Sequence, residues 1–145
     1  MERLLIVGAV ILVAVVVALV IDRRRPDAPT APRWAIPTQL DRADFPGPAV
    51  PWLVAVFTSS TCDACAGTVS KAAVLASDDV VVEEVEIGSQ PELHRRYAVD
   101  AVPLVVVADG EGVVRASFVG PPTATDLWAA VADLRDPGPE PVGPR

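Results

Sequence analysis

Residues that bind metals or form disulfides are scarce in this sequence. It has two cysteines, Cys62 and Cys65, and one histidine, His94. A structural disulfide framework usually uses more cysteine pairs at longer spacing. A zinc site built on these two cysteines needs a second pair of ligands, so it would require a second chain. We therefore expect no bound metal, and we expect His94, which lies beside Arg95 and Arg96, to be a surface residue.

Motifs for several common activities are also missing. The sequence has no glycine-rich phosphate-binding loop, no pair of catalytic carboxylates, no Ser-His-Asp set and no internal repeat. Its formal net charge is −7, from 12 basic and 19 acidic residues, and residues 34–145 alone hold 7 basic and 16 acidic residues. Without a basic patch, this acidic balance argues against nucleic acid as a ligand. No cofactor is expected either.

One long apolar segment is present near the N-terminus, after a short tail of residues 1–3. Residues 4–21 run for 18 positions without a charge, and as a helix they would span about 27 Å, close to the hydrocarbon thickness of a bilayer. A buried core helix rarely runs this long without a polar position. The run also exceeds the apolar part of a cleaved signal peptide, and no A-x-A-like cleavage site follows it. The pattern therefore predicts a transmembrane helix over residues 4–21 that binds the lipid bilayer.

The charges that flank this segment favour one orientation. Arg3 precedes it, whereas Arg23, Arg24 and Arg25 follow it. Basic residues next to a membrane span tend to stay in the cytoplasm. We expect a single-pass protein of the cell membrane with its domain on the cytoplasmic face, while the extracytoplasmic orientation stays open.

Two proline-rich segments bound the expected folded domain. Residues 22–37 contain four prolines and predict a semi-rigid linker. Residues 136–145 contain four more and predict a disordered tail. Residues 38–135 are left as one domain.

Hydrophobic periodicity within this domain predicts alternating strands and helices. Strands are expected over residues 52–58, 80–87, 104–108 and 113–119, and helices over residues 62–77, 91–97 and from a capping sequence at 123–126 onward. The first helix is expected to bury Val69, Ala72, Ala73 and Ala76, and the last helix Leu127, Val131 and Leu134. Residues 38–48 are expected to add a short helix or an edge strand. A βαβ unit followed by a hairpin predicts an α/β fold with a mixed central sheet flanked by helices.

The two cysteines stand where a buried strand passes into a helix. They form the CxxC sequence Cys62-Asp63-Ala64-Cys65. At a helix N-terminus, unpaired N–H groups and the helix dipole stabilise a thiolate, so Cys62 is expected to be the attacking or leaving sulfur. Cys65, one turn further in, is expected to be more buried and to resolve a mixed disulfide. Cysteines without a redox role are the less favoured alternative.

The sequence resembles the thioredoxin family over roughly residues 36–135. Residues 57–65 (FTSSTCDAC) are similar to the family's strand, loop and CxxC. Residues 97–103 (YAVDAVP) look like the segment that leads to its cis-proline, and residues 118–120 (FVG) match the place of a glycine after its hairpin. The resemblance implies a thioredoxin-like fold with a cis Pro103 beside the two sulfurs. It also implies a substrate-binding surface at Thr61, Val102 and Pro103, where Val102 offers its backbone to an extended segment.

The sequence departs from the family at positions expected to tune the chemistry. Thr61 stands in place of the usual tryptophan, and Asp63-Ala64 in place of Gly-Pro. Val56 aligns with the buried acid that helps to take the proton from the second cysteine, and Glu84 aligns with its basic neighbour. Val56 therefore suggests slower or more specialised reduction, and the negative charge of Asp63 disfavours the thiolate.

Two functions follow from these observations. The favoured one is a membrane-tethered thiol–disulfide oxidoreductase, with Cys62 as nucleophile and Cys65 as resolving cysteine. Its partners would be protein thiol or disulfide clients and an upstream electron donor or acceptor. The alternative is a thioredoxin-fold binding or adaptor module with weakened or lost redox activity.

Overall fold

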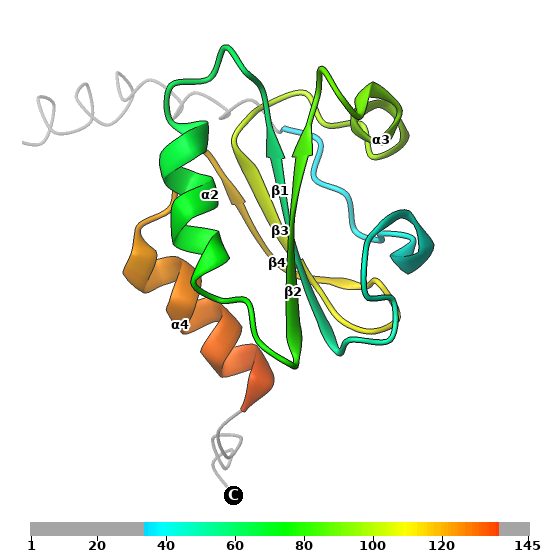
Figure 1. Ribbon diagram of the computed structural model, residues 1–145, viewed down its shortest axis with the longest axis vertical. Coiled ribbons are helices and arrows are strands. Elements are labelled where there is room, and N and C mark those ends of the chain that lie inside the picture. The colour runs from blue at the N-terminus through cyan, green and yellow to red at the C-terminus, as the bar shows by residue number, and fades with distance from the viewer. Residues whose placement is uncertain (1–33, 137–145) are drawn as a thin grey trace, which may run out of the picture. The chain divides into compact units, whose positions relative to one another are not determined.

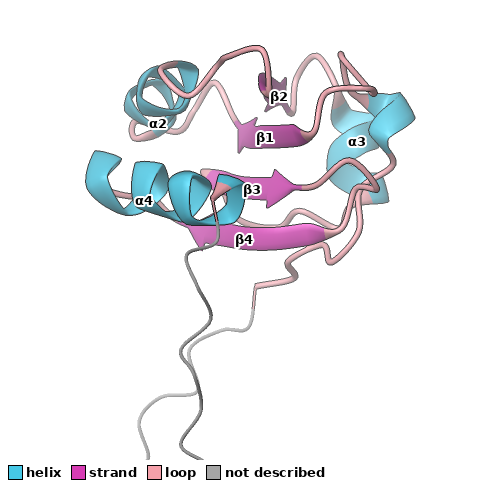
Figure 2. Cartoon of the chain, turned by 90° about the horizontal axis from the view of Figure 1, so that it is seen from below, coloured by secondary structure: helices cyan, strands magenta, loops and turns pink. Residues whose placement is uncertain are grey.

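The computed structural model describes residues 34–136, which form a four-stranded sheet with helices on both faces (Figures 1 and 2). The elements are η1 (Arg42–Asp44), β1 (Trp52–Thr58), α2 (Cys65–Ala73), β2 (Val80–Glu86), α3 (Pro91–Arg96), β3 (Leu104–Ala108), β4 (Val114–Val119) and α4 (Ala124–Arg135). The strand order is β2-β1-β3-β4. The α/β fold with a mixed sheet and flanking helices is as the sequence predicts.

A parallel strand pair positions the two cysteines. β1 is buried at every residue except its first, and it pairs in parallel with β2 from Trp52 opposite Val80 to Thr58 opposite Glu86. A parallel pair needs a crossover between its strands, and α2 provides it. The loop that carries Cys62 therefore leaves the sheet at the carboxyl end of β1.

An antiparallel hairpin completes the sheet. β3 lies beside β1 with Leu104 opposite Phe57, and β4 forms the edge of the sheet opposite β2. The turn between β3 and β4 depends on Gly112, whose φ is +80°. Its carbonyl accepts a hydrogen bond from the Leu40 N–H at 2.8 Å, and a Cβ at this position would collide with the Leu40 carbonyl oxygen. Only glycine fits this turn without a shift of the backbone.

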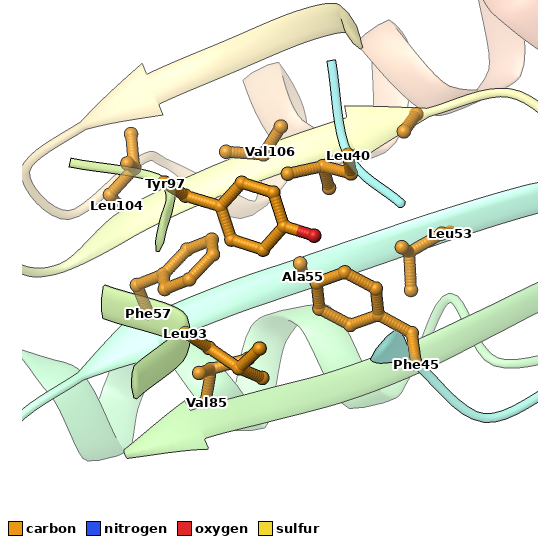
Figure 3. Packing of buried hydrophobic residues seen from close by; sticks show 11 residues of the cluster. Leu40, Phe45, Leu53, Ala55, Phe57, Val85, Leu93, Tyr97, Leu104 and Val106 are labelled. Atoms are coloured by element: carbon orange, nitrogen blue, oxygen red, sulfur yellow. The ribbon is translucent and has the colours of Figure 1, made fainter. Parts of the chain in front are cut away.

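Each face of the sheet has its own buried core. On the face covered by α2 and α4, the buried residues are Val54, Val56, Ala72, Val80, Val105, Val107, Leu127 and Val131. On the face covered by α3, aromatic rings gather between the sheet and the helix (Figure 3). The buried residues there are Leu40, Phe45, Leu53, Ala55, Phe57, Val85, Leu93, Tyr97, Leu104, Val106 and Ala108. The strict alternation of the strands separates the two cores.

Of the two structures that the sequence predicts for residues 38–48, the segment before β1 forms the short helix. η1 is a short 3₁₀ helix, and Gln39 forms an isolated bridge with Val113 beside the hairpin. The buried Arg42 side chain donates hydrogen bonds to the carbonyls of Gly47, Val50 and Asp109 at 2.9–3.0 Å. This side chain therefore fastens the segment to the end of β3.

The first helix is shorter than the sequence predicts. It begins at Cys65 and ends at Ala73 instead of spanning residues 62–77. Residues before it form tight turns, in which the Cys65 N–H donates to the Cys62 carbonyl at 3.2 Å. Ala73 and Ala76 are exposed, contrary to expectation, because the buried stripe of the helix runs through Cys65, Thr68 and Ala72.

The remaining predicted elements agree with the structure to within one residue at each end. The last helix is capped as expected, since the Thr123 hydroxyl accepts a hydrogen bond from the Asp126 N–H at 3.1 Å. Leu127 and Val131 are buried, and Leu134 packs against the same core.

Several predictions fall outside the described residues. They are the tail at 1–3, the transmembrane helix at 4–21, the linker at 22–37 apart from its last four residues, and the C-terminal tail after residue 136. Between residues 34 and 136, none of the helices has the length and apolar character needed to cross a membrane.

Candidate functional site

Cys62 and Cys65 form a disulfide at the carboxyl end of β1, with their Cα atoms 5.5 Å apart. Cys62 lies in the loop before α2, and Cys65 is the first residue of that helix. No side chain caps α2 at Ala64, so the positive end of its dipole lies next to the disulfide without a competing carboxylate on the cap. Cys62 is therefore one turn ahead of the helix rather than within it, which corrects the predicted boundary.

The two cysteines differ in exposure as expected. Cys65 is 4% exposed, whereas Cys62 is half-buried. A thiol in solution therefore reaches the sulfur of Cys62 more easily than that of Cys65. The unequal exposure supports different roles for the two residues in an exchange reaction.

Hydrogen bonds hold the loop between β1 and Cys62. The hydroxyls of Ser59 and Thr61 lie 3.0 Å apart, and the Ser60 N–H donates to Glu86 Oε1 at 3.2 Å. The other oxygen of Glu86 accepts from the Ser89 N–H at 2.9 Å. Hydrogen bonds from the backbone N–H groups of Gly88, Ser89 and Ser60 hold the pKa of the Glu86 carboxyl below its usual range. Glu86 thus ties this loop to the turn that follows β2.

A cavity of about 360 Å³ lies beside the disulfide. Its lining residues are Ser59, Ser60, Cys62, Cys65, Ala66, Val69, Glu84 and Glu86. Glu84 is held there by the buried Thr58, whose hydroxyl donates to Glu84 Oε1 at 2.8 Å. The cavity is therefore acidic on the side of β2.

Sequence reasoning did not place the two glutamates at the cysteines. The resemblance marks Glu84 only as the position of the family's basic residue, and no motif in the sequence marks Glu86. The alternation of β2 carried the signal, because residues 80, 82, 84 and 86 share the face that α2 covers. Val56 is fully buried and pairs directly with Glu84, so the aligned positions are neighbours in the sheet.

The predicted substrate-binding residues lie at the same end of the sheet as the disulfide. The Val102–Pro103 peptide bond is cis, as the resemblance implies. Pro103 is buried and directly precedes Leu104, the partner of Phe57 near the end of β1. Its carbonyl accepts a hydrogen bond from the Gly120 N–H at 2.8 Å, which joins the end of the hairpin to this proline.

Not every predicted residue contributes to the cavity. Val102 is half-buried and packs against the core on the α3 side. Thr61, Asp63 and Ala64 are exposed on the loop. None of these four residues, nor Pro103, belongs to the cavity lining. The roles of Val102, Pro103 and Thr61 in binding a substrate stay predictions.

His94 is buried, which contradicts the predicted surface position. It is 3% exposed, its Nε2 lies 2.8 Å from the Val85 carbonyl, and its ring meets Phe57 edge to face. The short helix α3 turns Leu93 and His94 toward the sheet and leaves Arg95 and Arg96 outside. His94 therefore packs on the opposite face of the sheet from the cysteines. Within residues 34–136, no group of three or more His, Cys, Asp or Glu side chains could hold a metal ion.

Four features together define the class of the thioredoxin-like domains. They are a buried strand, a loop with a CxxC disulfide, a helix that begins at the second cysteine and a cis-proline at the neighbouring strand. Comparison with known proteins agrees with this class at the level of structure. No protein-family model and no curated protein matches the chain.

Solved thioredoxins are similar to the described domain. The germline-specific thioredoxin Deadhead from Drosophila melanogaster is 27% identical, with 60% of this chain and 84% of that chain covered and a TM-score of 0.53. A mutant thioredoxin from Halobacterium salinarum is 19% identical, with 63% and 80% covered and a TM-score of 0.54. A thioredoxin from Fasciola hepatica is 24% identical, with 57% and 79% covered and a TM-score of 0.50. The domain has a thioredoxin-like fold, which confirms the resemblance found in the sequence.

Proposed function

We propose that the protein is a thiol–disulfide oxidoreductase that works through Cys62 and Cys65. The observation that carries the proposal is the disulfide between a half-buried Cys62 and a buried Cys65 at the head of α2. The similarity to thioredoxins supports the same activity. Clients would be proteins with accessible thiols or disulfides, and an upstream electron donor or acceptor would restore the starting state.

The proposed reaction in the reducing direction has two steps. The Cys62 thiolate attacks one sulfur of a client disulfide, and the electron pair of the broken bond leaves on the other client sulfur. The Cys65 thiolate then attacks Sγ of Cys62 in the mixed disulfide. This second step forms the Cys62–Cys65 disulfide and releases the remaining client sulfur as a thiolate. Oxidation of client thiols uses the same residues in reverse order.

Residues around the disulfide would set the rate and the clients. A client segment would lie against Val102, Pro103 and Thr61 at this end of the sheet. Asp63 adds a negative charge beside the nucleophile, and Val56 leaves the floor of the site without a carboxylate.

Trapping of a mixed disulfide tests the oxidoreductase function. The Cys65→Ser variant of the full chain should accumulate disulfide-linked clients, because a serine hydroxyl in place of the Cys65 thiol cannot resolve the bond to Cys62. The double variant Cys62→Ser and Cys65→Ser is the matched control and should trap none. Non-reducing electrophoresis and mass spectrometry would identify the adducts, and insulin reduction would report turnover by the unmodified chain.

The same variants distinguish the oxidoreductase function from an adaptor function. The exposed Thr61 and Asp63 and the apolar Val56 favour an adaptor over rapid catalysis. An adaptor would copurify with its partner even as the double serine variant. Absence of any adduct through Cys62, together with such copurification, would overturn the oxidoreductase proposal.

We further propose that residues 4–21 tether the domain to the cell membrane, with the domain on the cytoplasmic face. The charge-free run and the three arginines at 23–25 support this proposal. A cysteine introduced in the proline-rich tail of a Cys62→Ser, Cys65→Ser chain should resist a membrane-impermeant thiol reagent in intact cells and react after permeabilisation. Efficient labelling of intact cells would place the domain on the other side.

A further inference from the structure

The buried thiol of Cys65 needs a route for its proton, and the cavity beside it offers one. In the second step of the proposed reaction, Cys65 must change from thiol to thiolate before it attacks Cys62. A free thiol has a pKa of about 8.5, so at neutral pH most of it is protonated. Burial disfavours the charged form further, and Cys65 is 4% exposed.

No acid or base lies beneath Cys65 on β1. The β1 residues on this face are Trp52, Val54, Val56 and Thr58, and Val56 is fully buried in the core under α2. Besides Cys65 itself, α2 contributes Ala66 and Val69 to the cavity lining. Neither side chain can accept a proton as a carboxylate or a histidine can. Among the residues that line the cavity, a partner for the proton must therefore come from β2 or from the loop.

Two carboxylates from β2 line the cavity, and they differ in how their oxygens are used. Glu86 accepts backbone hydrogen bonds on both oxygens, from Ser60 and from Ser89. Glu84 Oε1 accepts from the Thr58 hydroxyl, while its Oε2 has no hydrogen-bond or ion-pair partner among residues 34–136. Asp63, the remaining nearby acid, is exposed on the loop and does not line the cavity.

We propose that Glu84, positioned by Thr58, accepts the proton of the Cys65 thiol when Cys65 resolves a mixed disulfide at Cys62. The S–H electron pair of Cys65 becomes the new bond to Sγ of Cys62, and the proton passes to the Glu84 carboxylate. The bond between Cys62 and the client breaks, and its electron pair leaves on the client sulfur. Glu84 then returns the proton to that thiolate or to solvent, so no further reactant is needed.

The proposal rests on the oxidoreductase function. It assigns to Glu84 the role of proton acceptor, which the resemblance gives to a buried acid at the position of Val56. The carboxylate would then lie on the edge strand β2 and not on the buried strand β1. The two positions are adjacent, because Val56 and Glu84 are direct partners in the sheet. The charged groups that face the cavity are Glu84 and Glu86 on β2, and Asp63 lies on the adjoining loop. Each bears the same sign of charge, so no cation competes for the proton acceptor.

A chromogenic aromatic disulfide, dithiobis(nitrobenzoate), separates the two steps. Mixed with the reduced full chain in equimolar amount, it releases one coloured thiolate when Cys62 attacks and a second when Cys65 resolves the adduct. The second phase is independent of reagent concentration and reports the proton-dependent step. Stopped-flow absorbance from about pH 5 to pH 9 would give its pH profile.

The test variant is Glu84→Gln, whose side-chain oxygen still accepts the Thr58 hydrogen bond. We expect the second phase to slow by about tenfold near pH 7 and to recover at high pH, where hydroxide removes the proton. The matched control is Glu83→Gln. Glu83 is the adjacent residue of the same strand and faces the other side of the sheet. Its charge acts on Glu84 only from a distance, so Glu83→Gln should change the second phase much less than Glu84→Gln does.

The direction of the change distinguishes the proposal from a simple charge effect. A carboxylate that acts only by repulsion raises the pKa of a nearby thiol, so its removal would speed the second phase. An unchanged or faster second phase in Glu84→Gln, or an equal loss in Glu83→Gln, would overturn the role of Glu84. A wild-type chain that releases only the first thiolate would instead contradict the oxidoreductase function itself.

Discussion

At the scale of single residues, the loop between β1 and α2 makes the two sulfurs unequal. Cys62 precedes the helix and is half-buried, while Cys65 starts the helix and is buried. The exposed carboxylate of Asp63 lies between them in the chain, and the helix has no capping side chain. The helix dipole and Asp63 therefore act on the Cys62 thiol in opposite directions.

Removal of the Asp63 charge should make Cys62 a stronger acid. In the Cys65→Ser background, Asp63→Asn is expected to lower the pKa of the Cys62 thiol, because the negative charge of this exposed neighbouring residue disfavours the thiolate. The pH dependence of iodoacetamide alkylation would give this pKa.

Asp78→Asn provides the control for this charge change. Asp78 is an exposed residue just before β2, at the opposite end of the sheet from the cysteines. It should leave the alkylation profile where it is. Equal shifts in both variants would mean that overall charge, and not the position of Asp63, controls the thiol.

At the scale of elements, the hairpin turn and the segment before β1 support each other. The Leu40 N–H donates to the Gly112 carbonyl, and the Gln39 side chain donates to the Glu111 carbonyl at 2.7 Å. Gly112 lies in the left-handed region and has the Leu40 carbonyl where a Cβ would be.

Gly112→Ala should therefore destabilise the domain by about 2 kcal/mol or more, through backbone strain and loss of the contact with Leu40. Urea unfolding of the full chain in mild detergent, followed by circular dichroism, would measure the change. Gly110→Ala is the matched control, two residues away in the same turn, because a Cβ there meets nothing closer than 3.8 Å and φ is not positive. Similar losses in both variants would contradict a specific role for position 112.

The sequence predicts the strands better than the helix that carries the cysteines. Residues 52–57 and 104–108 are apolar throughout, and such runs bounded by turn residues leave little choice of structure. The start of α2 is set by turns at Cys62 and by the disulfide, which periodicity does not detect. The predicted surface position of His94 is wrong for a related reason. Its neighbours Arg95 and Arg96 indicate a surface helix, but the His94 side chain points to the sheet and contacts the Val85 carbonyl.

The cavity beside the cysteines was predictable only in part. The CxxC motif and the cis-proline follow from the resemblance, and β2 alternation places Glu84 and Glu86 on the face under α2. The hydrogen bonds that their carboxylate oxygens accept come from Thr58 and from the loop amides, whose positions follow from tertiary packing.

At the scale of the whole molecule, ion pairs join separate elements of the fold. Asp109, at the end of β3, is 8% exposed and pairs with Arg115 on β4 at 2.6 Å. Burial raises the pKa of the Asp109 carboxyl, but hydrogen bonds from Arg115 and from the N–H groups of Val113 and Glu111 outweigh it, and the net pKa is lowered. Asp44 has a lowered pKa as well, because the Tyr97 hydroxyl and Arg96 donate hydrogen bonds to it.

These lowered carboxyl pKa values predict a loss of stability in acid. A carboxyl whose pKa is lower in the folded state stabilises the fold above its unfolded value of about 3.9, and this contribution disappears as the pH falls through the folded value. The free energy of unfolding of the full chain should therefore decline as the pH falls below about 4, in urea titrations at a series of pH values.

A variant separates Asp109 from the general effect of acid. Asp109→Asn should be less stable than the wild type at pH 7, because Arg115 loses its carboxylate partner, and the difference should shrink as the pH falls through the lowered pKa of the wild-type carboxyl. Asp133→Asn, at an exposed position of α4, should show no such convergence. A difference between Asp109→Asn and the wild type that stayed constant from pH 7 to pH 2 would mean that shape, and not charge, joins β3 to β4 at this position.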